Sequence, residues 1–205
     1  MARRGVIDTM PIDTVVFDVG GVLVDWDPAH LYRQVFGEDD AALRRFLDEV
    51  CTWEWHHEHD RGARFADTIP ARCEQFPDDA EHIRLWETRY LDMVGGEIAG
   101  MQALVRGLHE DGRRLLILSN MPSEVWPPLV RRFPWLDELF DGAVISGDEG
   151  VVKPDPAIYR ALIDRHGVDP ARTAFVDDRA ENVEAAAALG FTAIRFTDAA
   201  SLVIP

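Results

Sequence analysis

The sequence predicts an α/β fold, namely a Rossmann-like, doubly wound parallel sheet of about five strands with an inserted helical cap. Two observations lead to this fold class. Short apolar runs alternate with helical patterns along most of the chain, which is typical of a parallel sheet with helices on both faces. In addition, about seventy residues of helical pattern separate the first apolar run from the second, which is too long for an ordinary connection.

The predicted strands are short runs rich in aliphatic and β-branched residues, and glycine or polar residues follow the first four of them. They cover residues 14–17, 114–118, 143–145, 173–176 and 192–196. The first four are nearly continuous in apolar character rather than alternating. We therefore expect them to be buried on both faces of the sheet.

Helical patterns lie between these strands. Apolar residues recur at helical spacing over 98–108, which predicts one helix, and another helix is expected over 180–189. Between them, Asp155 and Pro156 are typical of the N-cap and first position of a helix that Gly167 ends. The order of strands and helices is therefore the order that a doubly wound sheet requires.

The long insertion has its own helical signals. Asp27 and Pro28 begin its first helix and Gly37 ends it, whereas Pro70 must lie in the first turn of a later helix or kink it. The expected helices cover residues 28–36, 43–50, 65–76 and 83–93. We divide the chain into core residues 1–25, a helical cap over 26–94, and core residues 95–205.

The composition is that of a globular protein with an acidic surface. Its 205 residues suffice for one domain with an insert, and the 47% hydrophobic content allows a core without disulfides. With 21 basic and 37 acidic residues the net charge is -16, which opposes contact with nucleic acid or anionic membrane. We expect neither as a partner, and an anionic substrate must meet local positive charge.

The sequence also predicts a cytoplasmic protein. It has no run of about 18 apolar residues that could span a bilayer, and residues 1–13 lack the apolar stretch of a signal peptide. Cys51 and Cys73 are far apart in the sequence and are expected to be reduced thiols, most simply buried as small hydrophobic residues.

Polar residues follow four of the predicted strands. They are Asp18, Ser119 with Asn120, Lys153, and Asp177 with Asp178. Because the carboxyl ends of parallel strands share one edge of the sheet, all of them can converge on one ligand site there. Lys153 is the single lysine among 21 basic residues, which favours a position where a compact point charge is needed.

The chemistry of this set is coherent. A carboxylate at the end of a central strand can act as a nucleophile, and a neighbouring pair of carboxylates can hold Mg²⁺, which prefers oxygen ligands. A hydroxyl, backbone N–H groups and one ammonium can hold the oxygens of a phosphoryl group. The alternative for Asp177 and Asp178 is a turn with a helix N-cap, although one Asp would suffice for that.

These segments resemble the four motifs of the haloacid dehalogenase-like hydrolase superfamily. The matching segments are Phe17–Leu23, Leu118–Asn120, Val152–Pro156 and Phe175–Asp178 with Asn182. The resemblance is strongest to the subclass with a helical cap between motifs one and two (subclass I), which includes the α-D-glucose-1-phosphate phosphatases and the phosphatase domains of soluble epoxide hydrolases.

The resemblance implies a role for each matching residue. Asp18 would be the nucleophile that forms an aspartyl-phosphate, and Ser119 and Lys153 would bind the phosphoryl oxygens. Gly21 and Asn120, beside them in the motifs, are expected to contact the substrate. The Mg²⁺ ligands would be Asp18, the carbonyl group of Gly20, and Asp178. Asp177 would either bind the ion as well or contact its ligands without binding it.

One position departs from the family pattern. Most phosphatases of the superfamily carry a second Asp as general acid and base two residues after the nucleophile, and this chain has Gly20 there. General acid catalysis is typically worth about 10²- to 10⁴-fold. The proton must therefore come from another group, such as Asp25 or a cap histidine, or the leaving group must be good, as in an anomeric sugar phosphate.

The segment 53–62 is the least ordinary part of the predicted cap, with two tryptophans and three histidines. Its histidine spacing matches no zinc pattern. We expect either a surface that faces the substrate, with His59 or Arg61 and the tryptophan rings touching the leaving group, or an ordinary solvated surface. Trp26 is expected to be a packing residue.

The sequence therefore predicts a Mg²⁺-dependent phosphatase for a small phosphate monoester, and the resemblance favours a sugar phosphate. Transfer of the phosphoryl group to a hydroxyl other than water is a variant of the same chemistry. Two alternatives stay open. One is a metal-independent 2-haloacid dehalogenase, against which the adjacent carboxylates at 177–178 argue. The other is a non-catalytic, phosphate-binding regulatory protein.

Overall fold

The computed structural model describes residues 11–205, so the expectation about a signal peptide falls largely outside the described residues. Its centre is a five-stranded sheet in the order β5-β4-β1-β6-β7, in which every neighbouring pair is parallel. The strands are β1 (Thr14–Phe17), β4 (Arg114–Ser119), β5 (Gly142–Ile145), β6 (Thr173–Asp177) and β7 (Thr192–Arg195). This confirms the predicted fold class.

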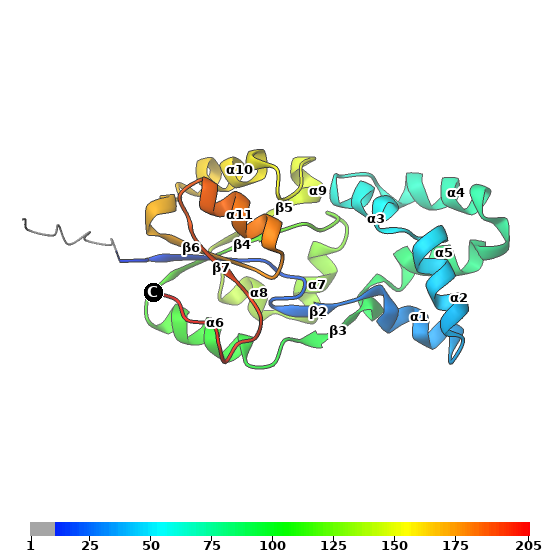
Figure 1. Ribbon diagram of the computed structural model, residues 1–205, viewed down its shortest axis with the longest axis horizontal. Coiled ribbons are helices and arrows are strands. Elements are labelled where there is room, and N and C mark those ends of the chain that lie inside the picture. The colour runs from blue at the N-terminus through cyan, green and yellow to red at the C-terminus, as the bar shows by residue number, and fades with distance from the viewer. Residues whose placement is uncertain (1–10) are drawn as a thin grey trace, which may run out of the picture.

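Helices cover both faces of the sheet (Figure 1). They are α6 (Met101–Glu110), α7 (Trp126–Arg132), α8 (Trp135–Glu138), α9 (Ser146–Glu149), α10 (Pro156–His166) and α11 (Ala180–Ala188), with a 3₁₀ turn η4 (Pro170–Arg172) before β6. As predicted, the Asp155 side chain caps α10 and Gly167 ends it.

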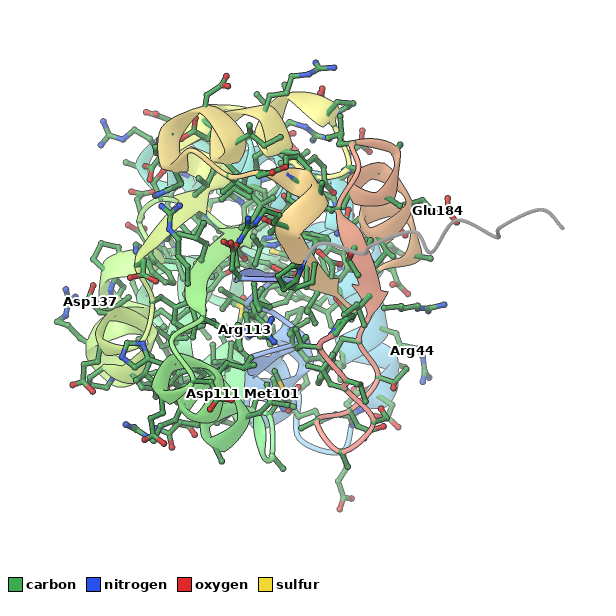
Figure 2. The ribbon with its side chains drawn as sticks, turned by 90° about the vertical axis from the view of Figure 1, so that its left-hand side faces the viewer. Arg44, Met101, Asp111, Arg113, Asp137 and Glu184 are labelled. Carbon is green, nitrogen blue, oxygen red and sulfur yellow. The ribbon has the colours of Figure 1, made fainter. Side chains whose placement is uncertain are left out.

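The fully buried strand β1 shows how two layers form on one sheet. Val15 and Phe17 belong to the hydrophobic cluster that includes Val105 of α6, whereas Val16 belongs to the cluster that includes Ile158 of α10. Side chains alternate across a strand, so a continuous apolar run supplies both layers. Charged side chains such as Arg44, Asp137 and Glu184 project from the outer surface instead (Figure 2).

The insertion between β1 and β4 is largely helical and forms a group to one side of the sheet (Figure 1). It contains α1 (Pro28–Phe36), α2 (Asp40–Arg45), a π-helical turn η1 (Phe46–Val50), α3 (Trp53–Asp60), α4 (Phe65–Gln75), η2 (Pro77–Asp79), α5 (Ala80–Thr88) and η3 (Tyr90–Met93). Pro70 lies inside α4 rather than in its first turn. Cys51 and Cys73 are buried and unpaired.

Two short strands stand at the ends of this helical insertion. β2 (Val24–Trp26) and β3 (Val94–Glu97) form an antiparallel pair that was not predicted from the sequence. Two consecutive glycines in β3 hide its strand character, because glycine is depleted in strands. The predicted cap limits, residues 26 and 94, fall on this ribbon, and the division into cap and core stays a prediction.

Within residues 11–205, every helix is too short or too polar to cross a bilayer. The cytoplasmic location expected from the cysteines stays a prediction.

Candidate active site

Asp18 directly follows the central strand β1. Its backbone N–H donates to the carbonyl of Val176 on β6 at 2.9 Å, and its Oδ1 accepts from the N–H of Val19 at 2.7 Å. The carbonyl of Val19 then accepts from the N–H groups of Leu23 and Val24, at 2.8 and 3.0 Å, which closes a tight loop. This loop fixes a largely buried carboxylate, 7% exposed, at the end of the sheet.

The single lysine lies against this carboxylate. The Nζ atom of Lys153 is 2.9 Å from Oδ1 of Asp18, 2.7 Å from Oδ2 of Asp177 and 2.8 Å from the carbonyl oxygen of Leu118. An ammonium has three donors, so all of them are used. Because the side chain is fully buried, these contacts hold its charge in one place.

Asn120 holds the backbone of the same lysine. Its Nδ2 donates to the carbonyl of Lys153 at 3.0 Å, and its Oδ1 accepts from the N–H of Lys153 at 2.8 Å. The end of β4 is thereby tied to the loop before α10. Ser119, the last residue of β4, is almost fully buried beside it.

Asp177 and Asn182 complete the support behind the lysine. Oδ1 of Asp177 accepts from the N–H of Arg179 at 2.9 Å, and Nδ2 of Asn182 lies 3.0 and 3.1 Å from the two carboxylate oxygens. Asp177 and Asn182 are both buried. Since both oxygens of Asp177 accept from protein donors, its contacts favour positioning Lys153 over binding a metal directly.

Asp178 faces the loop after β1 and is half-buried. A Cβ atom added to Gly21, which has a φ of +76°, would lie 2.8 Å from Oδ2 of Asp178. Only glycine therefore suits this position, because of both its backbone conformation and the approach of the carboxylate. Asp18, Asp177 and Asp178 each place one carboxylate oxygen within 4.8 Å of the others.

The electrostatics of this cluster call for a further cation. Burial raises the pKa of Asp18 to about 7; Asp177 adds to this shift and Lys153 opposes it. Burial and Asp177 also raise the pKa of Asp178. Burial would lower the pKa of Lys153, but Asp18 and Asp177 outweigh it and raise that pKa. Three carboxylates around one ammonium, with oxygen donors close together, fit a hard divalent ion such as Mg²⁺.

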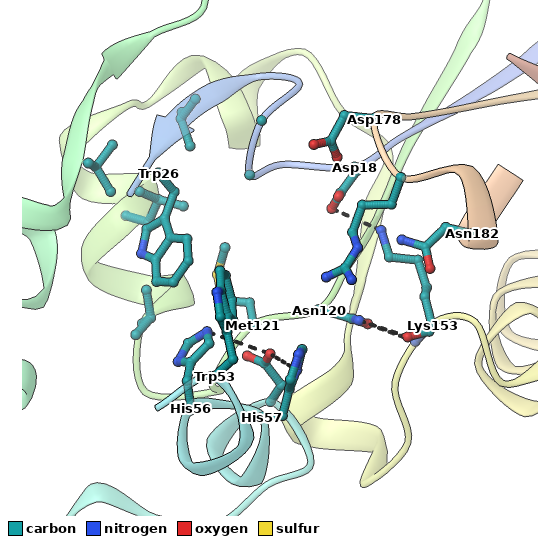
Figure 3. A pocket seen from close by; sticks show the side chains of 18 of the residues that line it. Asp18, Trp26, Trp53, His56, His57, Asn120, Met121, Lys153, Asp178 and Asn182 are labelled. Atoms are coloured by element: carbon teal, nitrogen blue, oxygen red, sulfur yellow. Dashed lines mark hydrogen bonds and ion pairs between the residues drawn. The ribbon is translucent and has the colours of Figure 1, made fainter. Parts of the chain in front are cut away.

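A cavity of about 560 Å³ lies above the strand ends. Six of the residues proposed from the sequence line it, namely Asp18, Gly20, Gly21, Asn120, Lys153 and Asp178. The cavity also receives side chains from the helical insertion, and Figure 3 shows Trp53, His56 and His57 of α3 below Asp18 and Lys153. The site therefore lies between the sheet and α3.

The structure does not bring His59 or Arg61 to this cavity. His59 of α3 is fully buried, and its Nε2 lies 2.6 Å from Oγ1 of Thr68. Burial lowers the pKa of His59 to about 4. Arg61 lies beyond the end of α3 and is exposed. Neither side chain is part of the lining of this cavity, and contact of His59 or Arg61 with a substrate stays a prediction.

Other residues of α3 take their place. Trp53, His56, His57 and Asp60 line the cavity, and they have the i, i+3, i+4, i+7 spacing of one helix face. That spacing is present in the sequence and could have identified them. Trp26 also lines the cavity, although the sequence suggested packing alone. Asp25 does not, because it is exposed and paired with Nε2 of His30 at 2.9 Å.

Comparison with known proteins agrees with this geometry. The family model described as haloacid dehalogenase-like hydrolase matches residues 12–190. The protein belongs to this family. It is a hydrolase, and it has phosphatases among its relatives.

Two curated relatives of this haloacid dehalogenase-like hydrolase are phosphatases. A sesquiterpene phosphatase of Aspergillus oryzae is 29% identical over 197 residues, which cover 89% of each chain. A phosphoglycolate phosphatase of Rhodospirillum rubrum is 30% identical over 190 residues, covering 86% of this chain and 76% of the relative. These names describe those proteins. Because the two relatives are named for different substrates, the substrate of this hydrolase has to be inferred from its own cavity.

Solved structures share the fold of this hydrolase. A HAD-like hydrolase of Porphyromonas gingivalis superimposes with a TM-score of 0.71 at 23% identity, over 91% of each chain. A HAD family enzyme of Bacteroides thetaiotaomicron, in complex with magnesium and inorganic phosphate, gives a TM-score of 0.71 at 20% identity, over 91% of this chain and 95% of that one.

Proposed function

We propose that this hydrolase is a Mg²⁺-dependent phosphatase that cleaves a small phosphate monoester through an aspartyl-phosphate at Asp18. The observation that carries the proposal is the buried contact of 2.9 Å between Lys153 and Asp18 at the floor of the cavity. This contact holds one carboxylate oxygen, so the other can act as the nucleophile. It also supplies positive charge where phosphoryl oxygens would lie.

The reaction has two steps. In the first, a carboxylate oxygen of Asp18 attacks phosphorus, the bond from phosphorus to the ester oxygen breaks, and the alcohol leaves with a proton. In the second, water attacks phosphorus of the aspartyl-phosphate and gives a proton to the group that protonated the alcohol, while the bond from phosphorus to the Asp18 oxygen breaks. Inorganic phosphate leaves and Asp18 is restored. The Ser119 hydroxyl and the N–H group of Gly20, whose neighbours in the loop already donate within it, are the donors that would hold the phosphoryl oxygens, while the charge of Lys153 attracts them.

The carboxylate cluster supports the cofactor. Asp18, the carbonyl group of Gly20 and Asp178 would hold Mg²⁺, while Asp177 fixes Lys153 through its hydrogen bond of 2.7 Å. When bound, the ion neutralises negative charge on the phosphoryl oxygens. The negative charge on Asp18 and Asp178, which burial and then Asp177 disfavour so that both pKa values are raised, would then be compensated.

The proton for the leaving group is assigned to α3. Of the two sources considered from the sequence, Asp25 does not line the cavity, whereas the cap histidines His56 and His57 do. We propose His57, because Oδ2 of the buried Asp60 lies 3.1 Å from its Nδ1 and can orient the ring. A carboxylate that fixes an imidazole in this way leaves the other ring nitrogen available for proton transfer.

The dehalogenase alternative fits the cavity less well. A (S)-2-haloacid dehalogenase of Burkholderia cepacia is 33% identical over 88 residues, covering 43% of this chain and 38% of the relative. However, the carboxylate of a haloacid substrate would meet Asp60 and Asp178 in this cavity. Among residues 11–205, the two cations that line it, Lys153 and Arg179, are both paired with carboxylates. Repulsion would weaken binding of such a substrate.

The test is phosphate release from p-nitrophenyl phosphate and from sugar phosphates, with Mg²⁺ and with excess chelator. We expect release that requires Mg²⁺. Chloride release from 2-chloropropionate that chelator does not affect would instead support the dehalogenase. Binding of Mg²⁺ and fluoroberyllate with no release from any ester would support the non-catalytic alternative.

A further inference from the structure

Much of the lining of the cavity is apolar. Figure 3 shows Trp26 across the cavity from Asp18 and Lys153, with Met121 and Trp53 between the two sides. The polar residues Asp18, Lys153 and Asp178 thus form one end. The apolar part of the lining, here called the apolar wall, consists of Val24, Trp26, Tyr90, Val94, Val125 and Leu129.

This apolar wall is held in place from behind. Val94, Val125 and Leu129 are each at most 3% exposed and belong to the main hydrophobic cluster, so they line the cavity as part of a packed surface. The Trp26 ring is stacked on Tyr90, with 6.1 Å between ring centroids and 26° between planes. A preformed apolar surface of this kind is typical of small-molecule sites.

Trp53 adds an exposed indole to the same cavity. Its side chain is 58% exposed, and it is one of two large hydrophobic residues with such exposure among residues 11–205. The ring lies 5.6 Å from that of Trp26. The other exposed residue, Val203, is near the end of the chain, whereas Trp53 stands where a ligand could cover it.

The charges of the cavity disfavour a second anionic group on the substrate. Arg179 lines the cavity, but its Nε and Nη2 lie 2.7 and 2.6 Å from Oε1 of Glu181. The three donors of Lys153 are already used. Asp60 adds negative charge on the α3 side. A carboxylate or second phosphate on the leaving group would therefore find no unpaired cation among the described residues that line the cavity.

Sugar hydroxyls would also lack partners along most of this wall. Hydrogen-bonding side chains outside the strand ends are His56, His57 and Asp60 of α3, the Tyr90 hydroxyl, and the single indole N–H groups of Trp26 and Trp53. The valine and leucine side chains cannot replace the water bound to several hydroxyls, and each of the two indole rings offers one donor at most. Polar groups buried without partners oppose binding, whereas hydrocarbon groups gain from leaving water.

We propose that the substrate is the phosphate monoester of an uncharged, mainly hydrocarbon alcohol, whose apolar group lies between Trp26, Trp53 and Leu129. This inference rests on the proposed phosphatase activity and replaces the sugar phosphate favoured by the sequence resemblance. A volume of about 560 Å³ lies within the usual range for small-molecule sites and accommodates a ring or a branched chain. Hydrolysis consumes one water and releases the alcohol and inorganic phosphate.

The test uses two esters matched in shape and leaving group, cyclohexylmethyl phosphate and glucose 6-phosphate. Each carries its phosphate on a CH₂ group attached to a six-membered ring, and they differ chiefly in ring hydroxyls. We expect kcat/KM to be at least about tenfold higher for the cyclohexylmethyl ester, which corresponds to about 1.4 kcal/mol. An equal or higher value for glucose 6-phosphate overturns the inference and leaves the phosphatase proposal standing.

Binding to the Asp18→Asn protein separates the two proposals. With Mg²⁺ present, calorimetry on this variant measures affinity for both esters without turnover. Tighter binding of cyclohexylmethyl phosphate supports the apolar site even if the wild-type protein releases no phosphate, a result that would overturn the phosphatase proposal alone. Equal or tighter binding of glucose 6-phosphate overturns the apolar site.

Variants of the wall provide the second test. Trp53→Ala removes an exposed ring, and Val125→Thr adds a hydroxyl at nearly constant shape. Each should raise KM for the cyclohexylmethyl ester about three- to tenfold while changing KM for methyl phosphate less than twofold. The controls are Val130→Thr in α7, the helix that follows Val125, and Val203→Ala, because neither residue lines the cavity. Equal changes in KM for both esters would contradict the proposed position of the apolar group.

Discussion

The strand ends and helix α3 form facing walls of one cavity but hold their side chains in different ways. At the strand ends, Lys153 uses all its donors, and Asp177 accepts hydrogen bonds at both oxygens. On the α3 side, Nδ1 of His56 and Oδ1 of Asp60 are buried without a partner among the described residues. Trp26 stacks on His56 at 4.8 Å, and its indole nitrogen is likewise unpartnered.

This difference separates a fixed wall, whose polar groups are paired, from an α3 wall that is held mainly by ring packing. Fully used hydrogen bonds fix one arrangement of charges before substrate binds, as electrostatic stabilisation of a transition state requires. On the α3 side the unpaired buried polar atoms carry a cost, and stacking of Trp26 on His56 holds the side chains instead. We therefore assign the chemistry that all substrates would share to the strand ends, and recognition of the leaving group to α3 and the wall beside it.

The largest expected effect is at the fixed wall. Asp18→Asn keeps the shape of the side chain but removes the nucleophile, so kcat should fall by about 10⁴-fold or more. Circular dichroism should show an unchanged fold. Asp25→Asn, an exposed residue outside the cavity, is the control and should retain activity. Activity of Asp18→Asn near that of the wild type would exclude Asp18 as the nucleophile.

Lys153→Met tests whether the same wall is held together by its charges. Loss of the ammonium leaves Asp18 and Asp177 buried without their cation, which should lower the free energy of unfolding by about 3–5 kcal/mol. Urea denaturation measures this change, and added Mg²⁺ should restore part of it. Arg165→Met, which breaks a surface pair with Glu149, should cost at most about 1 kcal/mol. Equal losses in the two variants would contradict the account.

The pH dependence of stability follows from the raised pKa of Asp18. Burial raises this pKa from 3.8 to about 7, so the folded state holds the proton more tightly than the unfolded state does. This group therefore contributes stability below about pH 4 that is lost as the pH rises through 7. In chelator, Asp18→Asn should gain in Tm relative to the wild type between pH 4 and pH 8. A constant difference in Tm would mean that Asp18 ionises normally.

Removing the proposed proton donor probes the α3 wall. His57→Ala should lower kcat on alkyl phosphates by about 10²-fold and change little with p-nitrophenyl phosphate, whose leaving group needs no proton. Asp60→Asn should act in the same direction, since it orients the ring. His109→Ala, an exposed histidine of α6, is the control. The same loss of kcat on both classes of ester would show that His57 does not donate the proton.

The smallest expected effect is a loss of stability and Mg²⁺ binding that should occur when Gly21 is replaced by Ala but not when its neighbour Gly20 is. Gly21→Ala puts a side chain at a φ of +76° and against Asp178, so it should cost about 1–2 kcal/mol of stability and weaken Mg²⁺ binding. Gly20→Ala should be nearly neutral, because its Cβ would meet only Cβ of Trp26 at 3.8 Å. Thermal denaturation and Mg²⁺ titration measure both variants. Similar behaviour would remove the assigned role of Gly21.

The tolerance at Gly20 also allows a gain-of-function variant. Gly20→Asp restores the acid that is present at this position in most phosphatases of the superfamily, and it should raise kcat on alkyl phosphates most strongly in the His57→Ala background. No rescue, with Mg²⁺ binding intact, would mean that proton donation does not limit the rate.

The sequence predicted the fixed wall because local and global signals agree there. Apolar strands such as Thr14–Phe17 end in polar residues, and the parallel topology brings those ends together whatever the details of packing. It did not predict which face of α3 meets the cavity. From the sequence alone, His57 and His59 are equally plausible site residues. Only the packing of α3 decides that His59 is buried and His57 lines the cavity.

Elements that depend on tertiary context were also missed. The strand β3 contains Gly95 and Gly96, and α7 begins with Pro127 and Pro128 in its first turn, so both carry signals that normally indicate loops. The prolines are tolerated because the first N–H groups of a helix have no partner within it. β3 pairs with β2, which a local pattern cannot reveal.

The most direct test of the central claim is to find the phosphoryl group on the protein during turnover. The enzyme would be mixed with p-nitrophenyl phosphate and Mg²⁺, quenched in acid and digested, and its peptides examined by mass spectrometry before and after treatment with hydroxylamine. We predict a hydroxylamine-sensitive phosphoryl group on the peptide that contains Asp18, and none in the Asp18→Asn protein. A phosphoryl group on another residue, or undiminished phosphate release by Asp18→Asn, would contradict the account.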